Sequence, residues 1–155
     1  MPTIKLTPHF TLAELTASST AKRLKLDNTP GSDALRRLQG TAEMLERIRS
    51  TLNAPIIITS AYRGPAVNRA VGGVSSSDHM TGQAADIVSP SFGSPYKVAK
   101  TLAPLVQTLG IGQLILEGIK GKQWVHVSTR IPEKPSNRVI TITDAGARMG
   151  IQVLA

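Results

Sequence analysis

Residues 77–86 of the chain read Ser-Asp-His-Met-Thr-Gly-Gln-Ala-Ala-Asp. Within this stretch, His79 and Asp86 are seven residues apart, which is too far for one turn of a helix and suits a loop that leads into a strand. Gly82 between them allows the backbone to turn sharply. A histidine near an aspartate is common in proteins, so the pair alone does not establish a metal site.

A second histidine, His126, lies in the segment Trp124-Val125-His126-Val127-Ser128. Two imidazoles and one carboxylate leave a fourth tetrahedral position of Zn²⁺ open for water, as in catalytic rather than structural zinc sites. The chain contains no cysteine, so disulfides and thiolate ligands are excluded and any metal must use His and carboxylate. His79, Asp86 and His126 are therefore the candidate ligands.

The composition indicates one domain over residues 1–155. The chain has 155 residues, 41% of them hydrophobic, which is enough for a substantial core. No segment approaches the ~18 consecutive apolar residues of a membrane span, so we expect no stable membrane insertion. Residues 1–8 lack the apolar stretch of a signal peptide, so we expect synthesis in the cytoplasm without a secretory route of the chain's own.

The formal net charge is +8, from 18 basic and 10 acidic side chains. This balance favours acidic partners such as nucleic acid, anionic lipid or an anionic cell-wall polymer. A solvated surface tuned for solubility explains the charge equally well, because the basic residues are scattered. Aromatic residues are not interleaved with them to stack on bases, so we expect no nucleic acid partner; a salt-sensitive shift of DNA by the protein would contradict this.

Helices are expected at four places. Thr11 and Glu14 form a capping box that predicts a short helix over about 11–17. Apolar residues at three- and four-residue steps predict an amphipathic helix over 32–52. Two more are expected at 65–70 and from Ser94-Pro95 to Gly110, with a kink at Pro104. The polar or Gly- and Ser-rich stretches 18–31 and 72–82 are expected to be loops.

Strands are expected mainly in the second half of the chain. A buried strand at 56–59 and a second at 84–88 precede a hairpin of 113–117 and 123–129. Residues 138–143 are expected to form a last strand, whereas 144–155 show no clear pattern. Helices first and strands later predict an α+β fold with a small, largely antiparallel sheet flanked by helices.

The complete pattern Ser-x-His-x-x-Gly-x-Ala-x-Asp, with Trp-x-His downstream, resembles the signature of the M15 family of zinc peptidases. This group includes D-alanyl-D-alanine carboxypeptidases and phage endolysins, and it shares its signature with the Hedgehog fold. Further segments that are similar to the family, in the same order, are 9–15, 60–63, 68–74, 114–117 and 124–128. The resemblance covers most of the chain. It implies Zn²⁺ held by His79, Asp86 and His126.

The resemblance also implies Arg63 as a residue on the substrate side. An arginine at a strand exit beside a metal can hold a carboxylate or stabilise an oxyanion. The alternative for Arg63 is a surface ion pair.

A general base is still needed to take a proton from water and return it to the leaving amine. Many family members place an acidic residue two or three positions before the last His, but here Gln123, Trp124 and Val125 precede His126. Glu117 is the best substitute, because a hairpin that turns tightly at 119–122 puts it opposite Trp124 and diagonal to His126.

A slip of one residue in that hairpin would turn Glu117 to the wrong face and leave it a solvated glutamate. Asp78 is the second candidate, although we expect its side chain to point away from the metal. Ser77 is expected to hydrogen-bond a ligand or cap a turn, and Trp124 to pack beside the site. His9 is not expected to be a ligand, because it adjoins the N-terminal capping box.

These residues and the resemblance predict a zinc metallopeptidase that cleaves an amide bond in peptidoglycan stem peptides, with Glu117 and Arg63 as catalytic residues. We expect a monomeric phage or prophage endolysin that is made in the host cytoplasm and reaches the cell wall after release by a partner membrane protein. The alternative is a catalytically inactive module of the same fold that binds zinc and serves in cell-wall binding or in a virion.

Overall fold

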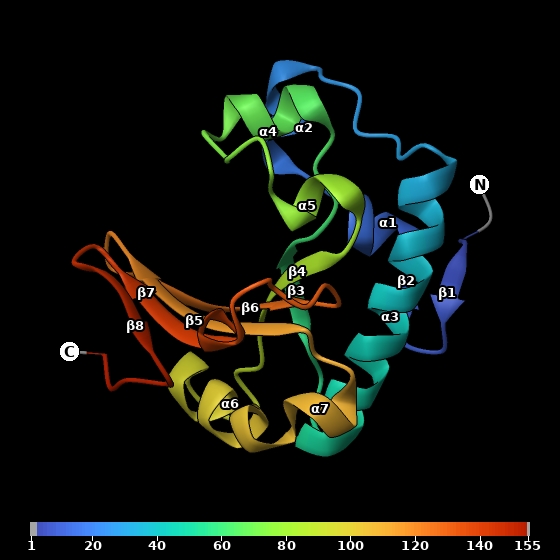
Figure 1. The fold of residues 1–155 in the computed structure, drawn as a ribbon. Helices are drawn as coiled ribbons and strands as arrows, with labels where there is room; N and C mark the ends of the chain where they lie inside the picture. Colours follow the sequence, from blue (N-terminus) through green and yellow to red (C-terminus); the bar gives the residue numbers. More distant parts are fainter. Residues whose placement is uncertain (1–2, 155) are drawn as a thin grey trace.

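The computed structural model describes residues 3–154 and contains a six-stranded sheet (Figure 1). The strand order is β3-β4-β6-β5-β7-β8. Their bounds are β3 (Ile57–Ser60), β4 (Ala84–Val88), β5 (Gln113–Ile119), β6 (Lys122–Ser128), β7 (Val139–Thr143) and β8 (Gly146–Met149). Every neighbouring pair is antiparallel except β5 and β7, which are parallel. The expected α+β fold with a mostly antiparallel sheet is confirmed.

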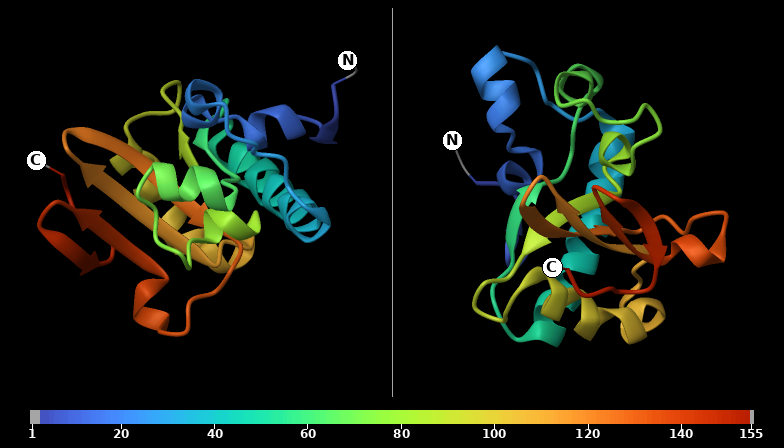
Figure 2. Two further views of the ribbon diagram at one scale, coloured as in Figure 1. Left: turned by 90° about the horizontal axis from the view of Figure 1, so that it is seen from above. Right: turned by 90° about the vertical axis from the view of Figure 1, so that its left-hand side faces the viewer.

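Helices lie on both sides of this sheet, with α4 and α5 on one side and α6 and α7 on the other (Figures 1 and 2). The helices are α1 (Leu12–Thr16), α2 (Ser19–Leu24), α3 (Ser32–Leu52), α4 (Pro65–Ala70), α5 (Asp78–Thr81), α6 (Pro95–Leu102) and α7 (Val106–Leu109), with 3-10 turns at Ala103–Leu105 and Pro135–Asn137. A small separate ladder joins β1 (Lys5–Thr7) to β2 (Phe10–Thr11). No helix within residues 3–154 is long and apolar enough to cross a membrane.

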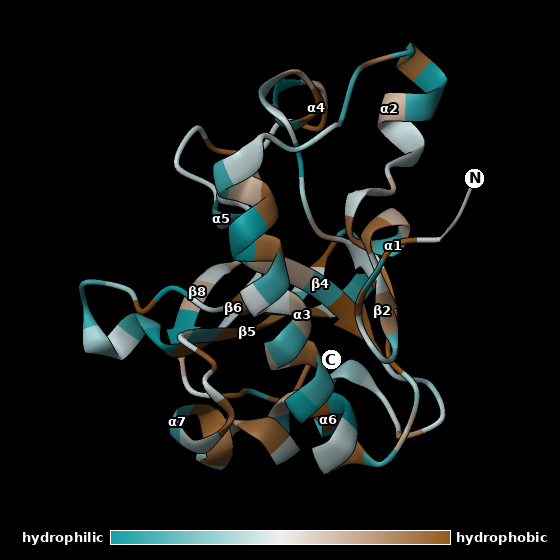
Figure 3. Ribbon diagram, turned by 90° about the vertical axis from the view of Figure 1, so that its right-hand side faces the viewer, coloured by the Kyte–Doolittle hydropathy of each residue, from teal (hydrophilic) through white to brown (hydrophobic). Residues whose placement is uncertain are grey.

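The longest helix, α3, has the bounds that its apolar spacing predicts. It presents polar and apolar residues on different sides (Figure 3), and its buried residues include Leu38, Leu45 and Ile48. The helix ends at Asn53, which adopts the left-handed conformation with φ 49°. Burial of this apolar stripe, rather than local propensity alone, stabilises a helix of this kind.

The two faces of the sheet have different roles. Leu114 and Leu116 of β5, with Val125 and Val127 of β6, belong to the main hydrophobic core together with residues of α3 and α6. Side chains alternate along a strand, so His126 and its neighbours in register point to the opposite face. We call that opposite face, which carries Asp86 and His126, the ligand face.

The β5–β6 hairpin has the register on which the Glu117 assignment depends. Ile119 pairs with Lys122, and the two residues between them, Lys120 and Gly121, have φ values of 50° and 78°. Positive φ at both positions is the two-residue turn that matches the twist of a hairpin. Glu117 is paired with Trp124, as the sequence predicts.

Several segments differ from the sequence-based expectation, and one is the β1–β2 ladder, for which no strand was expected. Both expected loops contain a short helix, α2 within 18–31 and α5 within 72–82. Residues 146–149, for which no pattern was evident, form the edge strand β8, with every residue exposed. The sequence predicts a buried strand near 56–59, but β3 is an edge strand and Ile57 is 53% exposed. Ile57 pairs with Val88 and points away from the core, whereas its neighbour Ile58 packs against the core.

Candidate metal centre

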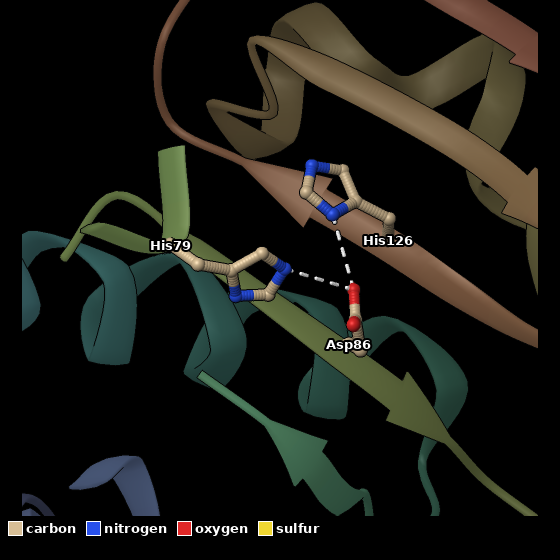
Figure 4. A group of neighbouring side chains, drawn as sticks. All are labelled: His79, Asp86 and His126. Atoms are coloured by element: carbon tan, nitrogen blue, oxygen red, sulfur yellow. Dashed lines mark hydrogen bonds and ion pairs between the residues drawn. The ribbon is translucent and has the colours of Figure 1, made fainter. Parts of the chain in front are cut away.

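Three elements bring His79, Asp86 and His126 together on the ligand face (Figure 4). His79 comes from α5, Asp86 from β4 and His126 from β6, where it is paired directly with Asp86. One nitrogen or oxygen atom of each residue lies within 4.8 Å of the others. All three side chains are largely covered, with exposed fractions of 4%, 14% and 11% in chain order.

The short helix α5 sets the position of His79. The Ser77 hydroxyl caps this helix by accepting a hydrogen bond from the His79 backbone N–H at 3.2 Å, and Gly82 ends it with φ 82°. The His79 Nδ1 lies 2.6 Å from the carbonyl oxygen of Ala61. A carbonyl oxygen only accepts, so Nδ1 carries the proton and Nε2 is left with a lone pair for a metal.

The donor atoms have the spacing of a tetrahedral zinc site. The His79 Nε2 and the His126 Nδ1 lie 3.3 and 3.0 Å from the same oxygen of Asp86, Oδ1. Metal–ligand bonds of about 2.0–2.1 Å in a tetrahedron place neighbouring donors roughly 3.3 Å apart. The donor types and these two separations therefore fit Zn²⁺.

Without a metal, Asp86 and His126 shift each other's pKa in opposite directions. Burial by itself raises the pKa of the Asp86 carboxyl, but hydrogen bonds from His126 and His79 and their charges outweigh burial and hold it well below its ordinary value. Burial by itself lowers the pKa of His126, but the hydrogen bond and charge of Asp86 raise it above its ordinary value. Asp86 is thus present as the carboxylate that a metal requires.

Arg63 lies beside the centre and is tied to the same helix. Its backbone N–H donates to the His79 carbonyl oxygen at 3.1 Å, and its Nη2 donates to the Ser77 hydroxyl at 3.2 Å. Burial lowers the pKa of the guanidinium, and the charges of Asp86 and Glu117 offset part of this effect. The buried Nε has no hydrogen-bond partner among residues 3–154. Buried donors are normally hydrogen-bonded, so this partnerless Nε is an exception at the edge of the centre.

Glu117 lies on the ligand face opposite Trp124, two residues along the hairpin from the Ile115–His126 pair. It is half-buried, and burial together with the charge of Asp86 raises the pKa of its carboxyl, while His126 and Arg63 lower it in part. No hydrogen bond from residues 3–154 occupies the carboxylate. A carboxylate with a raised pKa and free oxygen atoms is suited to accept and return a proton.

Asp78, the second candidate base, is instead engaged away from the centre. Its Oδ2 accepts a hydrogen bond from the Ser128 hydroxyl at 3.0 Å, and its Oδ1 accepts one from Arg130 Nε at 2.5 Å. The expectation that it points away from the metal is confirmed. These contacts join α5, which carries His79, to the end of β6, which carries His126, and the sequence alone gave no sign of Ser128 and Arg130 in this role.

The remaining candidates fall outside the metal ligand set. Ser77 has the expected capping role, at the start of α5, and its hydroxyl also accepts a hydrogen bond from Arg63. Trp124 is half-buried beside Glu117, and its Nε1 has no partner among the described residues. His9 pairs with Glu46 at 2.9 Å and is not a ligand. Asn28, which sequence reasoning missed, holds the turn at Arg63 by donating to the Tyr62 carbonyl oxygen and accepting from the Gly64 N–H.

Two histidines and one aspartate form a buried group, and Glu117, whose carboxylate has no hydrogen bond from the described residues, and Arg63 lie beside it. This arrangement is typical of a metal-dependent hydrolase. The Peptidase M15 family model matches residues 8–128, and the chain belongs to this family. Membership implies a metallopeptidase that acts on peptidoglycan-like substrates. No curated protein matches the chain. The family match ends at the last residue of β6, so β7 and β8 lie beyond it.

Proposed function

We propose that the protein is a zinc-dependent peptidase that hydrolyses an amide bond in peptidoglycan stem peptides. The convergence of His79 Nε2 and His126 Nδ1 on one oxygen of Asp86 is the observation that carries this proposal. Bound Zn²⁺ would supply a Lewis acid and lower the pKa of a water molecule at its open position. The remaining chemistry belongs to residues of the chain.

In this proposal Glu117 takes a proton from the attacking water and then gives it to the leaving amine. Its raised pKa brings the carboxyl closer to neutral pH, which makes both transfers easier. Arg63 directs its partnerless Nε toward the oxygen of the scissile carbonyl, where negative charge develops. The partial burial of both groups strengthens their electrostatic effect relative to bulk water.

We also propose a role as a phage or prophage endolysin that works on the wall as a monomer after release from the cytoplasm. The net charge of +8 supports an anionic wall as the partner, because it raises the rate of encounter with such a polymer. The resemblance to a group that contains endolysins points the same way. The alternative, an inactive zinc-binding wall or virion module, is favoured by the missing acid directly before His126.

The decisive experiment is mass analysis of purified peptidoglycan digested by the zinc-loaded protein. We expect new free amino groups and one type of cleaved stem-peptide bond. Zinc-loaded protein that releases no amino groups would contradict the enzyme reading and support the binding module.

A Glu117→Gln variant tests the base. We expect kcat to fall by about 10²–10⁴-fold, the range for loss of general base catalysis, with zinc content unchanged. Glu43→Gln on α3, the same change at an exposed residue away from the centre, is the matched control and should retain activity. If Glu117→Gln stays active with zinc bound, Glu117 is not the base.

A further inference from the structure

The register of the sheet places a row of side chains in line with the metal ligands. Asp86 pairs with His126, His126 with Ile115, Ile115 with Ile140, and Ile140 with Met149. Paired residues of neighbouring strands point to the same face of a sheet. The row that begins with two metal ligands therefore continues as three apolar side chains.

A second row runs parallel to the first through the candidate base. Trp124 pairs with Glu117, Glu117 with Ile142, and Ile142 with Ala147. Glu117 therefore lies between Trp124 of β6 and Ile142 of β7, and all three side chains point to the ligand face. Together the two rows give the ligand face a charged end, over β4 and β6, and an apolar end, over β5, β7 and β8.

The apolar end is separate from the main core of the protein. Among the described residues, Leu114 and Leu116 of β5 belong to the main core cluster, but Ile115 and Ile140 do not, although each is only 7% exposed. Ile142 is half-buried and Met149 is 69% exposed, so the apolar end opens to solvent at its far side. The strands β7 and β8 extend to one side beyond α4 and α5 (Figures 1 and 2).

An independent observation at the start of the second row also points to a ligand. The indole Nε1 of Trp124 is buried without a hydrogen-bond partner in residues 3–154. A buried indole N–H usually finds a partner, so this donor is available to a peptide oxygen of a bound substrate. Across the strands from β6 outward, the second row thus presents the Trp124 indole, the Glu117 carboxylate and then the apolar side chain of Ile142.

We propose that Ile115, Ile140, Ile142 and Met149 form an apolar subsite that binds an aliphatic side chain of the substrate residue next to the scissile amide. The identity of the bound group rests on the proposed function: the subsite is continuous with the metal centre and Glu117, so its ligand is taken to be the peptidase substrate. Three of its four residues come from β7 and β8, beyond the matched segment 8–128.

Binding can be measured separately from cleavage because Trp124 is the only tryptophan of the chain. The zinc-loaded Glu117→Gln protein is titrated with alanyl-norleucyl-alanine, its central residue in either configuration, and with alanyl-glycyl-alanine, while indole fluorescence is recorded. We expect one norleucine peptide to bind at least about tenfold more tightly than the glycine peptide, the size of effect that a few buried methylenes produce.

Ile142→Asn, added to Glu117→Gln, should remove most of this tenfold preference, and Met149→Asn should reduce it by a smaller factor. Met149 is so exposed that its replacement leaves folding unaffected, which guards against a variant that fails to fold. The matched control is Val153→Asn, which replaces an apolar residue that is 78% exposed near the end of the chain and should keep the preference.

Equal binding of the norleucine and glycine peptides, or a preference that survives both Ile142→Asn and Met149→Asn, would overturn the subsite. Failure of the proposed function looks different. In that case the wild-type protein with zinc releases no amino groups from peptidoglycan, yet the norleucine preference in binding is still present and still depends on Ile142.

Discussion

The charged end and the apolar end of the ligand face are held in contrasting ways. At the charged end, His79 is bonded to Ala61, and Asp78 to Ser128 and Arg130, so the ligand residues are fixed by hydrogen bonds between separate elements. Toward the apolar end, Glu117 has no hydrogen bond from the described residues, Ile142 is half-buried and Met149 is exposed. The contrast separates a centre whose side chains are held in place by hydrogen bonds from an apolar surface that we propose as a substrate subsite.

The largest effect is expected from Asp86→Asn, which removes the charge shared by both histidines. Zinc affinity should fall by more than the 10- to 100-fold that is typical of losing an outer hydrogen-bond partner, and peptidase activity should fall with it. Isothermal titration with Zn²⁺ and metal analysis measure the change. Asp33→Asn, which removes an exposed carboxylate paired with Arg36, should leave both quantities unchanged. Full zinc occupancy in Asp86→Asn would refute the ligand assignment.

Arg63→Met should lower kcat/KM by about 100-fold if Arg63 donates to the developing oxyanion, as we propose. Zinc affinity should stay within a few-fold of wild type, since Arg63 is not a ligand. Steady-state kinetics on the stem peptide identified by mass analysis, with metal content measured in parallel, checks both. Arg36→Met, in the exposed ion pair on α3, is the matched control. Loss of zinc without a separate loss of rate would assign Arg63 a purely structural role.

A smaller effect on zinc binding is expected from the hydrogen bonds of Asp78 to Ser128 and Arg130, which join two elements that carry ligands. Asp78→Asn should weaken zinc binding by about 10-fold, because it loosens the link between α5 and the end of β6. Arg130→Met should weaken it less, and the double variant should cost less than the sum, as expected for residues that act through one contact. Strict additivity of the two changes in titrations with Zn²⁺ would show that the contact does not position the ligands.

The smallest effect is a change of thermal stability with pH in the metal-free protein. The pKa of His126 is raised in the folded state, so its contribution to stability is full below the ordinary histidine pKa and is lost as pH rises through the folded value. The melting temperature should therefore fall by a few degrees between about pH 6 and pH 8.

Zinc should reverse this trend, because metal and protons compete for the same imidazole. Differential scanning calorimetry of metal-free and zinc-loaded protein measures both curves. Asp86→Asn should flatten the metal-free curve, since the carboxylate is what raises the pKa of His126. A metal-free protein whose melting temperature rises over this range would contradict the assigned coupling.

The contrast between the two ends also explains what could be predicted from the sequence. The ligand residues lie in a specific pattern, and the register of the β5–β6 hairpin follows from a two-residue turn with Gly121. The long helix α3 follows from its apolar spacing. The helix, the hairpin and the His79–Asp86 part of the pattern are each encoded within a short, continuous stretch of chain, and His126 lies in a second short motif.

The apolar end was missed because its contacts join distant segments. β8 is exposed along its length, so no alternation of polar and apolar residues marks it. Pairing of β7 with β5 is parallel and crosses residues 120–138, which leaves no local turn signal. The helices α2 and α5 are short and lie in polar or Gly- and Ser-rich stretches, whose composition predicts loops. Their N-cap residues, Ser18 and Ser77, are the sequence features that favour a helix at these places.

The central claim is that one zinc ion at His79, Asp86 and His126 makes this protein a peptidase. The direct measurement is a titration of metal-depleted protein with Zn²⁺ while amino groups released from purified peptidoglycan are counted. We predict that activity rises in proportion to added zinc and saturates at about one ion per chain, as for a single site of this donor set. Activity that is absent at saturating zinc, or that is undiminished in the metal-depleted protein, would contradict the account.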